Sequence, residues 1–81
     1  MEKQDEVKEK RTLKQIREAA GLSQQELSQQ INCGLRVVTN WENGRQMPKF
    51  DNAVAIARAL NCSLIELAEA MGMDVKGIPD Q

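Results

Sequence analysis

The feature that most constrains this chain is a series of short apolar stripes at helical spacing, each followed by a glycine or an asparagine. The first stripe contains Leu13, Ile16 and Ala20. Gly21 comes directly after it, at the place where a residue in the left-handed conformation would end a helix. The pattern therefore predicts a first helix near residues 12–20.

Two S-x-x-E sequences mark the beginnings of further helices. Ser23 opens SQQE and Ser63 opens SLIE. In such a capping box the serine hydroxyl accepts a hydrogen bond from the amide three residues on, and the glutamate carboxylate reaches back to the serine amide. The first box predicts a helix over about 24–31. The second predicts a last helix that continues to Met71 and ends at Gly72.

Two more helices are expected between these. Asn32 tolerates a positive φ and can turn the chain sharply, so Gly34 can serve as the N-cap of a helix over residues 35–43. Pro48 disfavours helix at Met47, which makes GRQMP a connector. The third helix should turn Val38 and either Trp41 or Val37 inward, with Glu42 near the same face.

A fourth helix is predicted from the next apolar stripe, which is closed by Asn61. The stripe consists of Phe50, Ala53, Val54, Ala57 and Leu60.

The organisation expected from these patterns is an all-α bundle of five short helices without strands. A chain of 81 residues is most simply one domain. Residues 1–11 carry four acidic and four basic side chains and are expected to form a flexible charged arm. The domain itself would span residues 12–71. Residues 72–81 contain scattered apolar side chains without a period, so a packed, swapped or loose tail all remain open.

Composition argues against several classes of protein. The chain has no histidine, which removes the commonest general base and a common zinc ligand, and Cys33 and Cys62 form no CxxC pair. We therefore expect no enzyme, no metal or other cofactor and no disulfide, and we interpret both cysteines as small buried apolar residues. No run approaches the roughly 20 apolar residues of a membrane span. The first residues also lack a secretion signal, so we expect a soluble, cytoplasmic protein.

The charge is small overall but unevenly distributed. The formal net charge is −1, which argues against binding nucleic acid by charge alone. Residues 12–50 hold five basic and three acidic side chains, whereas residues 51–81 hold two basic and five acidic ones. One end of the folded domain could therefore present a modestly positive surface.

Three stretches in a fixed order give the chain a family resemblance. They are LKQIREAAGLSQQELSQQI, VVTNWENGRQMP and AVAIARALNCSLIEL. Together they closely resemble the XRE-like family, which contains the helix-turn-helix DNA-binding domains of phage repressors and Cro proteins. The resemblance covers about residues 12–71. It implies a five-helix, repressor-like bundle in which the helices at 24–31 and 35–43 form the helix-turn-helix.

The resemblance also assigns the residues that would read DNA bases. In this family the helix at 35–43 would enter the major groove with its outer face. Arg36 can donate twice to guanine, and Asn40 can pair with adenine. Thr39 can contact a base or a thymine methyl group, and Leu35 can pack on a methyl group. The alternative is an ordinary solvated helix face, but an exposed Leu35 would gain nothing there without a partner.

Other positions would hold the domain on the DNA backbone or support the fold. By resemblance, the phosphate contacts come from Ser23, Gln24, Gln25, Asn43, Arg45 and Lys49. Simple solvent exposure is an equal alternative for Gln24. Arg17 and Glu42 occupy the positions of a structural ion pair that fixes the angle between two helices. The alternative for Arg17 is a phosphate contact.

The turn departs from the family pattern at three positions. Asn32 replaces the usual glycine, Cys33 stands at a usual valine, and Gly34 replaces the hydroxyl residue that normally caps the next helix. Both Asn32 and Gly34 are sterically acceptable, so the fold should survive. The weaker cap should cost a few tenths of a kcal/mol.

The leading hypothesis is a transcriptional regulator or repressor that binds double-stranded DNA sequence-specifically. A pseudo-palindromic operator would require a dimer with recognition helices about 34 Å apart. Relatives often pair through the last helix and the segment after it, so the candidate interface residues are Leu64, Ile65, Met71, Met73, Val75 and Ile78. Core packing alone would explain at least Leu64 and Met71. The alternative is a protein-interaction module of the bridging-factor or antitoxin type, whose partner would be a toxin or the transcription machinery.

Overall fold

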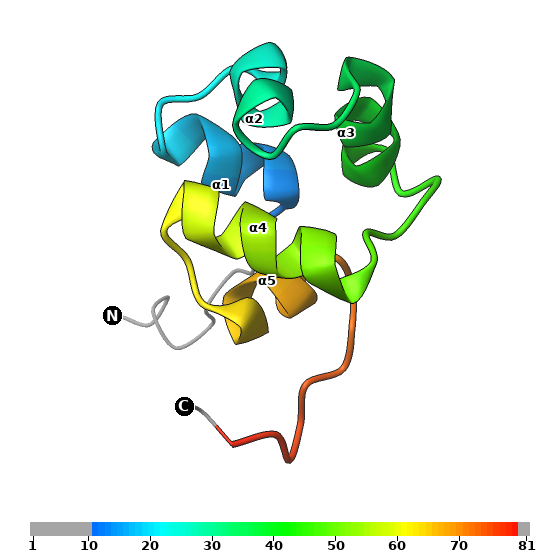
Figure 1. The fold of residues 1–81 in the computed structure, drawn as a ribbon. Helices are drawn as coiled ribbons and strands as arrows, with labels where there is room; N and C mark the ends of the chain where they lie inside the picture. The colour runs from blue at the N-terminus through cyan, green and yellow to red at the C-terminus, as the bar shows by residue number, and fades with distance from the viewer. Residues whose placement is uncertain (1–10, 80–81) are drawn as a thin grey trace, which may run out of the picture.

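The computed structural model describes residues 11–79 and contains five helices joined by short connections (Figure 1). They are α1 (Leu13–Ala19), α2 (Gln24–Gln30), α3 (Leu35–Glu42), α4 (Phe50–Leu60) and α5 (Leu64–Ala70). No strand occurs in the described part of the chain. The predicted all-α fold is therefore confirmed. The arm expected over residues 1–11 lies outside the described residues, apart from Arg11.

All five helices end in the same way. The residues with positive φ at their ends are Gly21, Asn32, Gly44, Asn61 and Gly72. At each end the next residue donates its amide to a carbonyl five residues back, as in a Schellman motif. The helix ends read from the glycines and asparagines of the sequence are confirmed.

The helix beginnings differ in two respects from the prediction. The SQQE capping box of α2 is complete. At α5 only half of the predicted box forms, because the Ser63 hydroxyl accepts from the Glu66 amide while the Glu66 carboxylate pairs with the Arg11 guanidinium. The complete SLIE box was thus a wrong prediction. A box that the sequence reading missed begins α1, where Thr12 and Gln15 cap each other reciprocally.

The core contains buried apolar side chains from every helix. It consists of Leu13, Ile16, Leu27, Val38, Trp41, Ile56, Ala57, Leu60 and Leu67. Complete burial of one large aliphatic side chain contributes about 1.5–3 kcal/mol. The larger share of the stability therefore comes from packing between helices, because helices of this length are marginal on their own.

The buried face of α4 differs from the predicted stripe. Ile56 is fully buried, although the predicted stripe omitted it. Phe50, which the stripe included, is 76% exposed. The inward row begins instead at Ala53 and continues through Ala57 and Leu60, at helical spacing. Phe50 is the first residue of α4 and lies beyond the core.

The two cysteines pack against the core but are only half-buried, so the prediction of small buried residues holds in part. Both are free thiols. Burial raises the pKa of Cys33 above the usual thiol value. Burial also raises the pKa of Cys62, with a further contribution from the Glu66 carboxylate and opposition from Arg11.

The arrangement separates two parts of the surface. In Figure 1, α2 and α3 lie at one end of the bundle, α5 and the segment after it lie at the other, and α4 lies between them. The outer side of α3 is therefore not covered by α5 or by the segment after α5.

Candidate nucleic-acid interface

The turn between α2 and α3 sets how these helices meet. The chain leaves α2 through Asn32, whose φ is 59°. The Cys33 amide then donates to the Ser28 carbonyl at 2.9 Å. Gly34 caps α3 without a side-chain hydrogen bond, as expected for a residue that has no hydroxyl. Residues 31–34 thus connect the two helices, and α2 packs directly on α3.

An ion pair buried beneath α3 joins it to α1. Arg17 donates from Nε to Glu42 Oε2 at 2.6 Å and from Nη2 to Oε1 at 3.3 Å. Its third bond runs from Nη1 to the Leu22 carbonyl at 2.8 Å. The two side chains are only 8% and 4% exposed. The hydrogen bond to Glu42 raises the pKa of Arg17, burial opposes the rise, and the charges of Glu42 and Glu18 add to it.

This placement favours the interpretation of Arg17 as part of a structural ion pair over that of a phosphate contact. All of its polar bonds are made inside the protein, so its guanidinium is not presented to a phosphate. The bidentate bond joins the end of α3 to α1.

Gln24 extends the ion pair toward the outer side of α3. Its Nε2 donates to Glu42 Oε1 at 2.8 Å, and its Oε1 accepts from the Thr39 hydroxyl at 3.3 Å. The residue is half-buried. The sequence predicts either a phosphate contact or solvent exposure for Gln24. The structure shows in addition that Gln24 links α2 to α3 through its bonds to Glu42 and Thr39.

The four residues expected to read bases divide into two kinds. Leu35 is 44% exposed and Arg36 is exposed, and no side-chain hydrogen bond is found for Arg36 among the described residues. Thr39 and Asn40 are half-buried and bonded within the protein. The Thr39 hydroxyl also lies 3.1 Å from the Leu35 carbonyl, and its single hydrogen can be donated either to this carbonyl or to Gln24. All four side chains belong to α3, and two of them are held by neighbours.

The residues expected at phosphates lie on either side of α3 in the chain. At the beginning of α2, Ser23 and Gln25 are exposed. After α3, Asn43, Arg45 and Lys49 are exposed. The two basic residues, together with Arg36, provide three exposed cations here, whereas the Glu42 carboxylate is paired with Arg17. The neighbouring Glu26 and Asp51 are also exposed, so the local charge is modestly positive, although the chain as a whole is slightly acidic.

A further contact on this face was not predicted from the sequence. Asn40 Nδ2 donates to Gln46 Oε1 at 3.2 Å. Gln46 comes after the turn at Gly44, within GRQMP, and the sequence reading treated that segment as a connector. The only sequence signal was its position two residues after a helix-ending glycine, which returns the chain toward the last turn of the helix.

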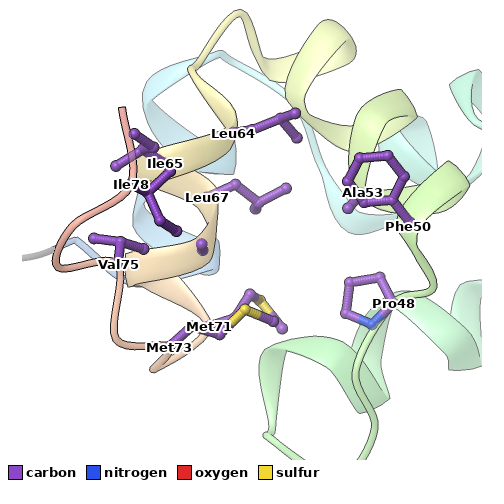
Figure 2. Close-up of a pocket in the computed structure, with 11 residues that line it drawn as sticks. Pro48, Phe50, Ala53, Leu64, Ile65, Leu67, Met71, Met73, Val75 and Ile78 are labelled. Carbon is purple, nitrogen blue, oxygen red and sulfur yellow. The ribbon is translucent and has the colours of Figure 1, made fainter. Parts of the chain in front are cut away.

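An apolar groove of about 480 Å³ lies between α5, the segment after it and the beginning of α4 (Figure 2). All six residues expected at a dimer interface line it. Pro48 and Phe50 form the opposite side in Figure 2. Leu64, Met73 and Ile78 are 41%, 44% and 53% exposed. Leu64 is therefore not explained by core packing, contrary to expectation, whereas Met71 does pack against the core.

No group of three or more metal-ligating side chains lies together within residues 11–79. None of the described helices has both the length and the apolar character that a membrane span requires.

The model of the XRE-type helix-turn-helix family, described as "Helix-turn-helix", matches residues 13–67, which is more than half of the chain. This is a family of DNA-binding regulatory domains that is not typically enzymatic. Neither the curated proteins nor the solved structures compared with the chain give a match.

Proposed function

The chain belongs to the XRE-type helix-turn-helix family of DNA-binding regulators, and from that premise we propose that it binds one particular double-stranded DNA operator as a dimer. In this proposal α3 enters the major groove of each half-site. The protein acts as a transcriptional repressor or activator, which implies that it works in the cytoplasm.

The observation that carries the proposal is the contrast between the two sides of α3. Val38 and Trp41 are buried on the inner side, and the neighbouring Glu42 carboxylate is bonded to Arg17 and Gln24. The outer side presents Arg36 and the other three candidate reading residues. A short helix that is fixed from below and exposes donors, acceptors and one aliphatic side chain suits base reading in the major groove.

The charges support specific rather than purely electrostatic binding. Arg45 and Lys49 are the exposed cations that would face phosphates in each copy. Four such contacts in a dimer predict that log K falls with log salt concentration with a slope of roughly −3 to −4. A protein interface of mainly apolar character should lack this dependence, so the slope separates the proposal from the bridging-factor or antitoxin alternative.

The proposed dimer forms through the apolar groove. One domain offers few base contacts, and a pseudo-palindrome requires two copies related by a two-fold axis. The groove contains the exposed Phe50, Leu64 and Ile78 together. A second copy of the chain would remove these side chains from water, which stabilises association by about 25 cal/mol for each Å² of apolar surface.

The test is selection of bound sequences from a random pool of duplex DNA by the purified protein. The wild type should enrich a two-fold symmetric site, and the Arg36→Ala/Asn40→Ala variant should lose that enrichment. Arg58→Ala is the matched control, because Arg58 is an exposed cation near the end of α4, outside the proposed interface. If the wild type enriches no sequence at low salt, the proposal is wrong and a protein partner should be sought.

A further inference from the structure

The side chain of Asn40 has a partner that no proposed role yet explains. Its Nδ2 donates to Gln46 Oε1 at 3.2 Å, across the turn that ends α3. Gln46 is an exposed residue of the connector to α4. It lies outside every set of residues assigned above to bases, phosphates, the ion pair or the groove.

The backbone places Gln46 beside Asn40. Gly44 has a φ of 77°, and its amide donates to the Trp41 carbonyl at 3.2 Å. The Arg45 amide then donates to the Asn40 carbonyl at 2.9 Å. These two bonds complete a Schellman motif, which returns the chain to the last turn of α3. Gln46 is therefore adjacent to a residue whose backbone is already bonded to Asn40.

We propose that Gln46 is a positioning residue, which holds the Asn40 amide in the orientation that reads adenine. The inference rests on the proposed function. The Asn40 amide group has two N–H donors and one carbonyl oxygen. Gln46 engages one N–H, so the other N–H and the oxygen remain available. That donor and acceptor match N7 and the N6 amino group of adenine.

The same bond would disfavour guanine at this position. Guanine presents two acceptors, N7 and O6, in the major groove. An amide that is free to rotate can turn its NH2 group toward these acceptors. An amide whose nitrogen donates to the Gln46 oxygen presents its own oxygen to O6, so that two acceptors face each other. Relieving this clash would require the bond to break or both amides to turn over together. Gln46 thus acts on the choice between bases through Asn40, without contacting the base itself.

The experiment compares Gln46→Met with Gln46→Glu. Methionine has a similar length but no carbonyl acceptor, whereas glutamate keeps an oxygen that can accept from Asn40. Affinity is measured for the selected operator and for operators with each base pair replaced. Gln46→Met should lower the preference for adenine over guanine at the base pair read by Asn40 by roughly two- to tenfold, the range expected for one hydrogen bond.

Gln46→Glu should keep that preference while it weakens binding to all sequences, because it adds a negative charge near the DNA. In an Asn40→Ala background, Gln46→Met should have no further effect on this base pair. Thermal melting of the free protein should be almost unchanged by either substitution at Gln46. These results together would separate positioning from a structural role.

Three outcomes would overturn the inference. An equal loss of affinity for all operators in Gln46→Met, with the base preference unchanged, would mean that Gln46 contacts a phosphate. A changed preference at a different base pair would mean that it reads a base itself. An unchanged preference in Gln46→Met would mean that the bond to Asn40 has no role in recognition.

Failure of the proposed function can be recognised separately by NMR of the protein without DNA. The Asn40 side-chain amide resonances should shift in Gln46→Met and stay close to the wild-type positions in Gln46→Glu. If the Asn40 resonances shift as expected but the wild type binds no preferred sequence, the proposed function is wrong, and so is the positioning role. If the Asn40 resonances do not shift in Gln46→Met while the wild type binds a specific sequence, only the positioning role is wrong.

Discussion

Replacing Arg17 by methionine should remove much of the stability of the domain. Methionine fills part of the same space but cannot donate a hydrogen bond. The Glu42 carboxylate, whose side chain is 4% exposed, would keep one bond from Gln24 and lose both bonds from Arg17. Breaking a buried pair in this way typically costs about 3–5 kcal/mol, because an uncompensated charge remains inside the protein.

That loss is large for a domain of this size. A chain of 81 residues at typical stability unfolds with about 4–12 kcal/mol. Arg17→Met should therefore lower the melting temperature by roughly 15–30 °C. Glu42→Leu should cost a similar amount, since it leaves the guanidinium buried with only the Leu22 carbonyl as partner. The double variant Arg17→Met/Glu42→Leu should recover most of the loss, because replacing both charges by apolar side chains is often nearly neutral.

The measurement is urea denaturation of the wild type, both single variants and the double variant, analysed as a double-mutant cycle. A cost below about 1 kcal/mol for Arg17→Met would be typical of an exposed pair. Additive costs in the double variant would mean that the two side chains do not depend on each other. Either result would refute the argument that the pair is buried and holds α1 against α3.

Three further predictions concern the cap of α3, the cysteines and the apolar groove. Gly34→Ser should stabilise the protein by about 0.5–1 kcal/mol in urea denaturation, because Gly34 has ordinary φ and room for a Cβ. The control Gly44→Ser should destabilise it by about 1 kcal/mol, because φ there is 77°. The raised pKa values of Cys33 and Cys62 mean that the folded state retains thiol protons that the unfolded chain loses. Stability should therefore fall as pH rises above about 8.5, and a double cysteine-to-alanine variant should reduce that slope. Phe50→Ser should weaken the dimer in analytical ultracentrifugation without lowering the monomer's stability, because Phe50 is 76% exposed; a large loss of stability would place this side chain in the core.

Features that depend on neighbours in the sequence were predictable here. The end of a helix depends on one residue that adopts positive φ, so Gly21, Asn32 and Gly44 marked their turns correctly. The SQQE cap likewise requires only residues three positions apart. Short-range chemistry of this kind therefore located the helices to within one or two residues.

Features that depend on residues far away in the sequence were less predictable. The Glu66 carboxylate had a local partner in the predicted capping box and bonded instead to Arg11, which is 55 positions away. Ile56 was missed because α4 is apolar on more than one side, and only packing against the other helices selects the buried row. The bonds from Gln24 to Glu42 and from Asn40 to Gln46 depend on how elements meet, and no spacing rule in the sequence indicates them.

The hydrogen bonds that hold side chains on the outer side of α3 lead to one further prediction, which concerns how strictly each base pair is read. Thr39 is bonded to Gln24 and Asn40 to Gln46, whereas Leu35 and Arg36 have no such support within the described residues. A side chain held in its binding orientation loses less conformational freedom on binding and tolerates fewer alternative bases. Because Thr39 and Asn40 lie in consecutive positions, their base pairs should be neighbours in the selected operator and vary least. The pairs under Leu35 and Arg36 should vary more, and a selected operator in which those pairs were the invariant ones would show that support from within the protein does not set the stringency of reading.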